Sequence, residues 1–493
     1  MIILECIGHE YFNEVSDIIK LFYGKTKISF HKNSDNNIQD TDLLLTSKII
    51  FDENLSSFTS SYLNLNDGNN KEITYTYTKK NQIQDKKEIK IALKISMYKL
   101  LSDVTGKKIP WGILTGIRPV KIVHQLIDKG MNDDEILNYF QTQYYADRDR
   151  AQLAIDVAKV QRKYIKNNDK NKISFYIGIP FCPSRCNYCS FTSNSIVKNK
   201  DLVKPYIDSL ILEIKEVSKY LISKGVKAQS IYIGGGTPTS IETGELEILL
   251  NCINEFWMDN EEFTCEAGRP DTISIDKLKA LKEAGITRLS INPQTMDDST
   301  LKRIGRKHNH SQIIEAFYLA RSLDFNNINM DIIIGLPGEG LKEFENTIDC
   351  INKLNPENVT VHTLAIKRAS IYNEIDFNNK QLHDNTAYKM MELARNNLEA
   401  NGYYPYYLYR QKYMADNLEN IGYCMKGKEC IYNIQIMEEK QSIVAFGADA
   451  VTKVYFSEED RLERQHNIKD LRLYIKNIDA QIDKKIRLLD ELY

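Results

Sequence analysis

The sequence lacks any long apolar run, and this absence excludes a helical membrane protein. No stretch of the 493 residues approaches the roughly 18 consecutive apolar residues that span a bilayer. An excess of either charge is also lacking, because 65 Lys and Arg residues are balanced by 67 Asp and Glu residues. Such a balance gives no electrostatic basis for binding nucleic acid or an anionic membrane. We therefore expect no nucleic-acid partner and no membrane span.

The start of the chain lacks the pattern of a secretory signal. Glu5, His9 and Glu10 lie where a signal peptide has its apolar stretch, and no basic segment precedes them. A disulfide framework is not indicated either. The cysteine count of nine is odd, and three cysteines are crowded together while the others are scattered. We expect a cytoplasmic protein.

Length and pattern along the chain predict three domains, at a usual size of about 150 residues each. Residues 1–165 join short apolar runs with polar loops to a region of helical periodicity, which indicates an accessory α+β domain. Residues 166–370 alternate β-branched runs with helical segments. Residues 371–493 are a mixed α/β region with an aromatic-rich segment. We expect this last domain to close the open side of the middle domain over its substrate.

The middle region has the alternation of strands and helices that is typical of a parallel sheet. Strands are predicted at residues 173–179, 230–234, 262–267, 287–292, 328–335 and 358–364. Helices are predicted between them at 202–224, 242–257, 274–284, 297–304 with 311–323, and 341–353. Six βα units in succession predict right-handed crossovers and a curved, partial (β/α)6 barrel. Functional residues are expected where the strands end.

The first predicted strand leads into GIPFCPSRCNYCSF, which places Cys182, Cys186 and Cys189 at C-x3-C-x2-C spacing. Three thiolates on one short loop can hold three irons of a cubane and leave the fourth open to a ligand. A structural zinc site is the alternative, but zinc usually takes four ligands. That site would need His308 or His310 from elsewhere in the chain. The spacing favours a 4Fe-4S cluster.

The second strand ends in IGGGTPTS, where Gly234, Gly235 and Gly236 leave the backbone open to a charged amino-acid group. A tight turn is the alternative reading. The segment does not have the G-x-G-x-x-G spacing of a dinucleotide site. Its position, one βα unit after the cysteines, is what makes it a candidate for ligand binding.

Further candidates recur near the ends of the remaining strands. They are Glu266, Gln294 and Ala365, together with Arg306 after a helix and Asp331 inside the fifth strand. Each residue alone is typical of a surface or turn position. A carboxylate within an apolar strand, however, is costly to bury without a partner. The recurrence on one rim favours a shared ligand site.

Six motifs occur in a specific order: YIGIPFCPSRCNYC, GGGTP, CEAGRPD, LSINPQ, RIGRKH and MDIIIGLP. Together they resemble the oxygen-independent coproporphyrinogen III oxidase family of the radical S-adenosylmethionine superfamily, over about residues 172–456. The segments PYYLYRQKYMADNLENIGY and PWGILTGIRP are similar to its HemZ-like group, which has an additional N-terminal domain. The chain is on this basis expected to be a radical S-adenosylmethionine oxidoreductase.

The resemblance implies a definite chemistry. The cluster would bind S-adenosylmethionine, which is cleaved to a 5'-deoxyadenosyl radical. That radical would remove hydrogen from a propionate of the tetrapyrrole coproporphyrinogen III, and loss of carbon dioxide would lead to protoporphyrinogen IX in porphyrin and haem biosynthesis. A low-potential electron donor such as flavodoxin or ferredoxin is implied as a partner.

The resemblance also implies two sets of cofactor contacts. Positions that match contacts of the first S-adenosylmethionine are Tyr176, Gly235, Glu266, Ala365 and Val451. Positions that match contacts of a second molecule are Tyr188, Gly236, Thr237, Gln294, Arg306 and Asp331. An arginine and an aspartate suit a zwitterionic ligand, because each pairs with an opposite charge.

Two positions depart from the family pattern. Gly178 replaces a histidine before the first cysteine, and Phe191 replaces a fourth cysteine. Two other functions therefore stay open: a haem-carrying chaperone and an anaerobic haem-opening methyltransferase. The chaperones usually have a His-Asn-x-x-Tyr-Trp segment, whereas the comparable segment here reads IYNIQIMEEK.

A porphyrinogen with four carboxylates needs cationic partners, because burying them unpaired is costly. Arg410, in the segment YYPYYLYRQKYM, is the candidate substrate contact. The alternative is that this tyrosine-rich segment packs the C-terminal region against the barrel.

Overall fold

A computed structural model describes residues 2–24, 26–31, 43–52, 55–64, 72–80, 85–116, 118–166, 169–190, 193–365, 370–374, 385–412 and 414–493. The chain forms two compact units. The first comprises Met1–Ile155 with Arg410–Leu418, and the second comprises Asp156–Tyr409 with Glu419–Tyr493. Residues of the C-terminal region contribute to both units, and the three domains at 1–165, 166–370 and 371–493 stay a prediction.

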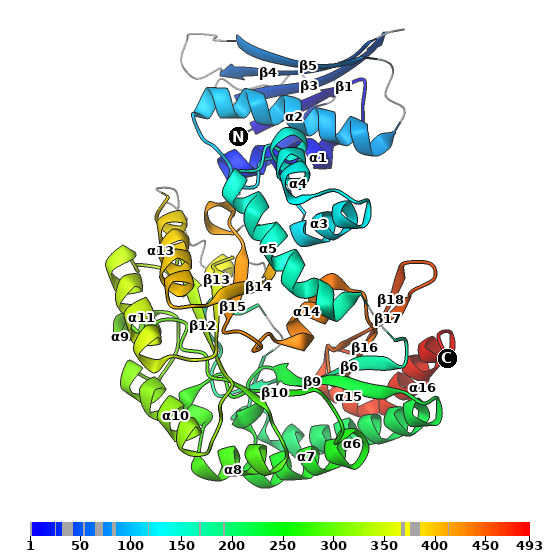
Figure 1. Cartoon of the computed structure of the whole chain (residues 1–493), viewed down its shortest axis with the longest axis vertical. Helices are drawn as coiled ribbons and strands as arrows, with labels where there is room; N and C mark the ends of the chain where they lie inside the picture. Colours follow the sequence, from blue (N-terminus) through cyan, green and yellow to red (C-terminus); the bar gives the residue numbers. More distant parts are fainter. Residues whose placement is uncertain are drawn as a thin grey trace. The chain divides into compact units, whose positions relative to one another are not determined.

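The first unit is an α+β fold, as predicted (Figure 1). Its five strands lie in the order β2-β1-β3-β4-β5. Their bounds are β1 (Ile2–Ile7), β2 (Ile28–His31), β3 (Leu43–Asp52), β4 (Leu55–Asn64) and β5 (Glu72–Lys80). The helices are α1 (Phe12–Tyr23), α2 (Lys86–Thr105), α3 (Pro119–Asp128), α4 (Asp133–Tyr139) and α5 (Arg148–Ile165), which continues into the second unit. Buried apolar residues of α1, α2 and the sheet form one core.

The second unit is built on the predicted parallel strands. They are β6 (Lys172–Ile179), β9 (Lys227–Gly235), β10 (Glu262–Glu266), β11 (Arg288–Ser290), β12 (Ile328–Ile334) and β13 (Asn358–Thr363). Each pairs in parallel with the next along the chain. The helices between them are α6 (Lys200–Ser223), α7 (Thr243–Trp257), α8 (Ile275–Glu283), α9 (Asp298–Arg303), α10 (His310–Ser322) and α11 (Leu341–Leu354). The partial barrel of βα units is confirmed.

C-terminal strands extend this sheet at both edges. On one side β15 (Asn420–Cys424) pairs antiparallel with β13, and β14 (Tyr404–Tyr409) pairs with β15. On the other side β16 (Ile443–Phe446) pairs in parallel with β6. The hairpin of β17 (Val451–Phe456) and β18 (Arg461–His466) follows β16. The sheet has 11 strands in total.

The remaining elements of the second unit are short or C-terminal. They are β7 (Phe181–Cys182), β8 (Asn194–Ser195), α12 (Ile371–Glu374), α13 (Thr386–Ala400), α14 (Ile431–Glu438), α15 (Leu471–Lys476) and α16 (Ile478–Asp490). The carboxylate of Glu262 accepts hydrogen bonds from the backbone N–H groups of Ile431 and Tyr432, at 2.9 and 3.1 Å. A carboxylate at a helix N-terminus satisfies donors that the helix leaves unpaired. Glu262 therefore fixes the start of α14.

A fully buried ion pair joins the C-terminal helix α16 to α6. Lys485 Nζ lies 2.5 Å from Glu213 Oε1, and both side chains are inaccessible to solvent. Glu213 also accepts hydrogen bonds from the Gly447 N–H and the hydroxyl of Tyr474, at 2.9 and 2.6 Å. Buried charges of this kind are stable only when paired and hydrogen-bonded. The pair thus holds the turn that precedes β17.

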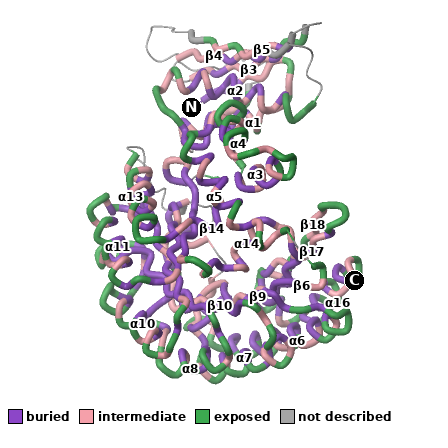
Figure 2. The backbone as a smooth tube through the Cα atoms, viewed as in Figure 1, coloured by how far each residue is buried: buried purple, intermediate pink, exposed green. Residues whose placement is uncertain are grey.

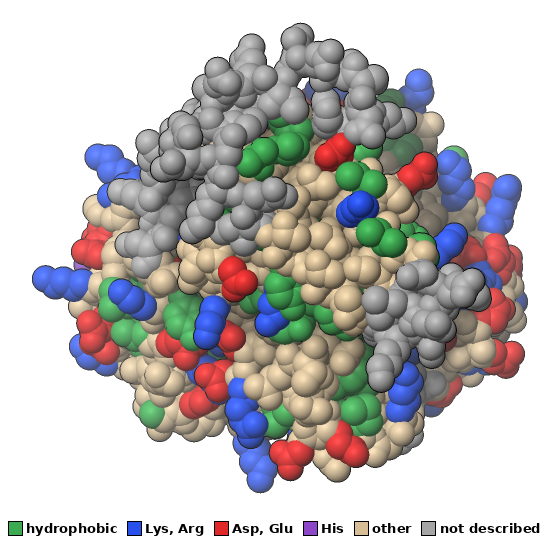
Figure 3. All heavy atoms as spheres, turned by 90° about the horizontal axis from the view of Figure 1, so that it is seen from above, with side chains coloured by type: hydrophobic (Ala, Val, Ile, Leu, Met, Phe, Trp, Pro, Cys, Tyr) green, Lys and Arg blue, Asp and Glu red, His purple; other side chains and the backbone are tan. Residues whose placement is uncertain are grey.

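The helices α6, α7, α8, α10 and α11 follow the outer side of the strands, and their outward faces are exposed while the strands are buried (Figures 1 and 2). In the face drawn in Figure 3, basic and acidic side chains are interspersed, in keeping with the balanced composition. Within the described part of the chain, no helix combines the length and apolar character needed to traverse a bilayer.

Candidate functional site

The cysteine loop, residues 182–189, begins where β7 ends. Within it the N–H of Cys189 bonds to the carbonyl of Cys186 at 3.1 Å. Burial raises the pKa of the Cys182 thiol to about 11. A hydrogen bond from Thr237 at 3.5 Å opposes this rise, and the charges of Cys186 and Cys189 add to it. The three thiols therefore lie within electrostatic reach of one another.

The loop is docked onto the segment that follows α9. The backbone N–H of Asn187 bonds to the carbonyl of Ile304 at 3.0 Å, and its side-chain amide bonds to the carbonyl of Arg303 at 2.9 Å. The hydroxyl of Ser184 donates to the carbonyl of Gly305 at 3.3 Å. Hydrogen bonds from Ser184 and Asn187 to residues 303–305 therefore fix the loop that carries the thiols.

The geometry bears on the choice between a cluster and zinc. Neither candidate fourth ligand reaches the cysteines: His308 pairs with Asp271 and His310 pairs with Asp298. Among the described residues, no three His, Cys, Asp or Glu side chains are gathered tightly enough to hold a single metal ion. A cubane instead distributes its thiolates over separate irons. The donor set of three thiols on one loop therefore fits a cluster better than a closed zinc site.

The glycine loop, residues 234–237, packs directly against the cysteine loop. The N–H groups of Gly236 and Thr237 donate to the carbonyls of Ile179 and Phe181, each at 2.8 Å. A Cβ on Gly236 would lie 2.5 Å from the Phe181 carbonyl oxygen and 3.0 Å from Cys182 Sγ. Gly235 has a φ of +109°, which side chains rarely tolerate. Both glycines are required by the turn and close approach, whatever ligand they bind.

Glu266, at the end of β10, lies among stacked tyrosines. The hydroxyl of Tyr232 donates to its carboxylate at 2.6 Å. Burial raises the pKa of Glu266 to about 7, although the bond from Tyr232 opposes the rise. The ring of Tyr232 stacks on that of Tyr432 at 4.5 Å and on that of Tyr176 at 6.4 Å. This side of the site is aromatic and contains a carboxyl group whose pKa lies near 7.

Arg306 is buried beside the cysteine loop. Its guanidinium donates to the carbonyls of Asn292 and Gly268, at 2.5 and 3.3 Å, and to the hydroxyl of Tyr188 at 3.3 Å. Its Nε is buried without a hydrogen-bond partner in the described residues. Such an orphaned donor is uncommon in a folded interior and is available to an anionic ligand.

Gln294 and Asp331 are joined through the backbone. The N–H of Gln294 donates to the carbonyl of Asp331 at 2.9 Å, and Gln294 has a φ of +70°. A non-glycine residue in this conformation marks a turn that the surrounding structure enforces. Burial acts to raise the pKa of Asp331, but bonds from His362, Asn329 and Thr360 outweigh it and hold the pKa below its usual value. Asp331 is therefore an anion in the folded protein.

His362 was not predicted from the sequence. Its Nε2 lies 3.6 Å from Asp331 Oδ2, and its Nδ1 lies 3.4 Å from the hydroxyl of Tyr409. The alternation of side chains along β13 could have indicated it, because residues two apart in a strand face the same side and His362 follows Thr360 by two residues. His362 links an aspartate and a tyrosine on the side of the sheet opposite the helices.

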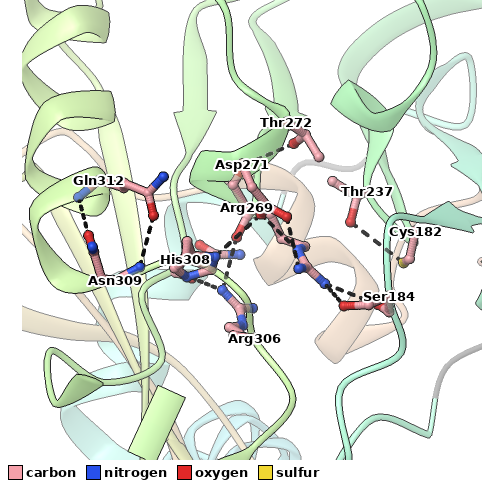
Figure 4. Close-up of polar contacts among 12 residues, drawn as sticks. Cys182, Ser184, Thr237, Arg269, Asp271, Thr272, Arg306, His308, Asn309 and Gln312 are labelled. Carbon is pink, nitrogen blue, oxygen red and sulfur yellow. Dashed lines mark hydrogen bonds and ion pairs between the residues drawn. The ribbon is translucent and has the colours of Figure 1, made fainter. Parts of the chain in front are cut away.

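Arg269, Asp271 and His308, drawn in Figure 4, form a second group that was not predicted. The sequence had suggested His308 only as a fourth ligand to zinc. Arg269 follows β10 and bonds both to Asp271 and to Ser184 of the cysteine loop. His308 lies between α9 and α10 and pairs with Asp271 at 3.3 Å. The motifs CEAGRPD and RIGRKH contain all three residues, but their pairing across 37 positions cannot be read from either motif alone.

The other predicted residues belong to further elements of the two units. Ala365 follows β13 and Val451 begins β17, and both are half-buried. Phe191 lies outside the described residues. Arg410 belongs to the first unit, where its buried guanidinium donates to the carbonyls of Leu114 and Asn417. These backbone carbonyls occupy donors of the Arg410 guanidinium, and its role as a substrate contact stays a prediction.

Comparisons with known proteins place this geometry in a family. The radical SAM superfamily model matches residues 176–351. The chain is 39% identical over 412 residues to the oxygen-independent coproporphyrinogen-III oxidase-like protein HemZ of Bacillus subtilis, a match that covers 83% of this chain and 82% of that protein. The chain belongs to the HemZ-like group of the radical SAM superfamily.

Two further comparisons, one of sequence and one of structure, relate this radical SAM protein to other proteins of known name. It is 33% identical over 284 residues to the haem chaperone HemW of Bacillus subtilis, which covers 56% of this chain and 70% of the chaperone. The structure of coproporphyrinogen III oxidase HemN from Escherichia coli aligns with a TM-score of 0.52 and 20% identity, covering 66% of this chain and 73% of that one. This second likeness shows the shared fold.

Membership in the radical SAM superfamily implies a 4Fe-4S cluster and S-adenosylmethionine. The residues present fit both groups. Three thiols share one loop, the orphaned Arg306 Nε is available to a carboxylate, and two carboxyl groups lie where a cationic group can pair with them. The family thus accounts for a concentration of buried charge that folding alone does not require.

Proposed function

We propose that the protein catalyses the oxygen-independent decarboxylation of coproporphyrinogen III to protoporphyrinogen IX. The observation that carries this proposal is the match to the HemZ protein over more than four fifths of both chains. The site supports it, because its charged residues lie at the strand ends where a parallel sheet binds ligands. We infer a place in haem biosynthesis and in the cytoplasm.

The cluster would be held by Cys182, Cys186 and Cys189, the three thiols of the cysteine loop. With S-adenosylmethionine bound, it would supply a 5'-deoxyadenosyl radical that removes hydrogen from a substrate propionate. The electron that starts this step would come from a low-potential donor such as flavodoxin or ferredoxin. The electron released when the substrate radical loses carbon dioxide and becomes a vinyl group would pass to an electron acceptor.

The residues of the chain would orient S-adenosylmethionine by charge. Arg306, with its buried and unpartnered Nε, would pair with the carboxylate of the ligand. Glu266 and Asp331 would pair with its amino group or sulfonium. Residues of both predicted contact sets, including Tyr176 and Thr237, lie in this same unit. Titration of the reconstituted protein with S-adenosylmethionine would show whether it binds one molecule or two.

The test is to reconstitute the protein without oxygen and incubate it with reductant, S-adenosylmethionine and coproporphyrinogen III. Mass spectrometry should show loss of two carboxyl groups in the wild type. Cys186→Ala should lose both its iron and its activity, whereas Cys252→Ala, a buried cysteine of α7, should keep both. Cleavage of S-adenosylmethionine with coproporphyrinogen left intact would retain the family and reject the decarboxylase.

Arg410 needs a different variant from a simple truncation. Because its guanidinium donates to backbone carbonyls and lies 5.3 Å from the Trp111 ring, Arg410→Ala would unfold its surroundings and lower activity indirectly. Arg410→Lys keeps the charge. If Arg410 binds substrate, the lysine variant should change KM for coproporphyrinogen while its unfolding temperature falls. A fall in stability with KM unchanged would assign Arg410 to folding alone.

Haem carriage is the second candidate, favoured by the match to HemW. The segment that corresponds to the chaperones' His-Asn-x-x-Tyr-Trp forms the start of α14, where Tyr432 packs against Tyr232. It offers no histidine to haem iron. Titration of the reconstituted protein with haem, followed by its absorption spectrum, separates the two functions: tight stoichiometric binding without decarboxylation would favour the chaperone.

A further inference from the structure

Arg269 bridges the cysteine loop and an aspartate by four hydrogen bonds. Its Nη1 donates to the carbonyl oxygen and the hydroxyl of Ser184, at 3.0 and 2.9 Å. Its Nε and Nη2 donate to the two carboxylate oxygens of Asp271, each at 3.0 Å. The side chain of Arg269 is only 4% exposed. Figure 4 shows the guanidinium lying between the aspartate and the loop.

His308 completes the group from a different part of the fold. Its Nδ1 lies 3.3 Å from Asp271 Oδ1, and its side chain is fully buried. Its Nε2 has no hydrogen-bond partner among the described residues. Leaving a buried polar nitrogen unpaired costs stability. A histidine is thus kept where an apolar side chain would be cheaper, in contact with the aspartate that orients Arg269.

Ser184 is well placed to control the thiols. It lies two residues after Cys182 and two before Cys186. On one side its carbonyl and hydroxyl meet Arg269, and on the other its hydroxyl reaches the carbonyl of Gly305 at 3.3 Å. The cysteine loop is consequently held on two sides. Among these described contacts to Ser184, only the one from Arg269 comes from a charged side chain.

The charge of Arg269 lies close to the cysteine loop in a buried place. Its guanidinium, only 4% exposed, bonds to the carbonyl oxygen and hydroxyl of Ser184, which stands between Cys182 and Cys186 in the chain. The potential of an iron–sulfur cluster depends on the net charge, hydrogen bonding and solvent exposure around it. A desolvated guanidinium acts strongly because the interior screens charge weakly.

We propose that Arg269, oriented by Asp271 and His308, is a positioning residue that fixes the cysteine loop and raises the reduction potential of its cluster. The inference rests on the assignment of the cluster to Cys182, Cys186 and Cys189. Asp271 and His308 act through Arg269, and none of the three needs to touch substrate. The positive charge favours the reduced, more negative cluster, so removing it makes reduction harder.

Two variants of Arg269 separate its charge from its geometry. Arg269→Gln removes the charge and should shift the midpoint potential of the reconstituted cluster to a more negative value. Arg269→Lys keeps the charge but loses the bidentate contact. It should keep a potential near that of the wild type and lose iron to a chelator about tenfold faster, as expected for a lost charge-assisted hydrogen bond. Arg321→Gln and Arg321→Lys, in α10, are matched controls because Arg321 pairs with Glu357.

His308→Gln is the second line of evidence if the Arg269 variants fail to fold. It should speed iron loss, whereas His310→Gln, which affects an exposed pair with Asp298, should not. A loaded Arg269→Gln cluster with the wild-type potential, or equal iron loss in His308→Gln and His310→Gln, would overturn the proposal. A wild type that binds no iron and sulfide would instead overturn the cluster assignment on which it rests.

Discussion

The two sides of the site hold opposite charges. Around the cysteine loop the buried charged groups are chiefly the guanidinium groups of Arg269 and Arg306, with Asp271 paired to the first. On the aromatic side they are the carboxyl groups of Glu266 and Asp331. The difference matches the two charges of an amino acid and the anionic thiolates of a cluster. Under the proposed function, charge separation within one interior would orient a zwitterion without any change of backbone.

Two carboxyl groups show how the surroundings set this contrast. Burial acts to raise the pKa of both, but His308 and Arg269 outweigh it at Asp271 and hold that pKa well below its usual value. At Glu266 burial raises the pKa to about 7 and the neighbouring anion Asp331 adds to the rise, while the hydrogen bond from the neutral donor Tyr232 opposes it only in part. The charge of the partner and the depth of burial together decide the sign of the shift.

Glu266→Gln should have the largest effect on the pH dependence of stability. In the unfolded chain Glu266 ionises near pH 4.5, whereas in the folded protein it ionises near pH 7. Folding therefore loses stability as the pH rises from about 4.5 to 7, by about 3 kcal/mol, at 1.36 kcal/mol per pKa unit. The glutamine variant should lack this loss.

Thermal unfolding of the apoprotein between pH 4.5 and 8 measures the effect. Glu283→Gln, at the exposed end of α8, is the control and should follow the wild type. If the unfolding temperatures of wild type and Glu266→Gln change with pH in parallel, the pKa of Glu266 is not raised toward 7 and the proposed contrast between the two sides of the site is wrong.

Arg306→Gln tests the cationic side and should have the next largest effect. Loss of a buried charged donor should weaken binding of S-adenosylmethionine by about 2 kcal/mol, or roughly thirtyfold. Calorimetric titration of the reconstituted protein gives the affinity, and its iron content shows whether the cluster is intact. Arg321→Gln is the matched control. Equal affinities in the two variants would remove Arg306 from the ligand contacts.

Tyr232→Phe sharpens the comparison with the smallest change. It removes the donor that lowers the pKa of Glu266, so the pH at which stability levels off should move above about 7. The lost hydrogen bond should cost about 1 kcal/mol. Tyr432→Phe keeps the same ring stack and serves as the control. The outcome that contradicts this reading is an identical pH profile in the wild type and both variants.

The parallel core of the fold could be predicted because its signals are local. Runs such as INMDIIIG are strongly β-branched, and each predicted strand lies within a few residues of the observed one. The C-terminal strands were harder. In β14 the segment YPYYLY has tyrosines on both faces, and its partner β15 pairs with the edge strand β13 of the parallel sheet. Nothing in that local pattern specifies an edge.

In the candidate site, too, the residues in local motifs could be predicted, whereas the pairings between distant residues could not. Cysteine spacing and strand ends are visible in the sequence, and the structure gathers most of the residues found there. The pairings of Arg269 with Ser184 and of His308 with Asp271 join residues 85 and 37 positions apart. The charge of Arg410 suggested a substrate contact, and the sequence did not show that its guanidinium donates to the carbonyls of Leu114 and Asn417. Such contacts are decided by tertiary packing.

The pairing of β16 with β6 has a consequence for how the protein is made. During synthesis β6 emerges early, but the strand that covers its free edge, Ile443–Phe446, leaves the ribosome near the end of the chain. Until then β6 presents unpaired backbone groups to other chains. Pairing over so long a separation is slow. Nascent or truncated chains that stop before β16 should therefore depend on chaperones and aggregate, even though every cysteine of the cluster loop is already present.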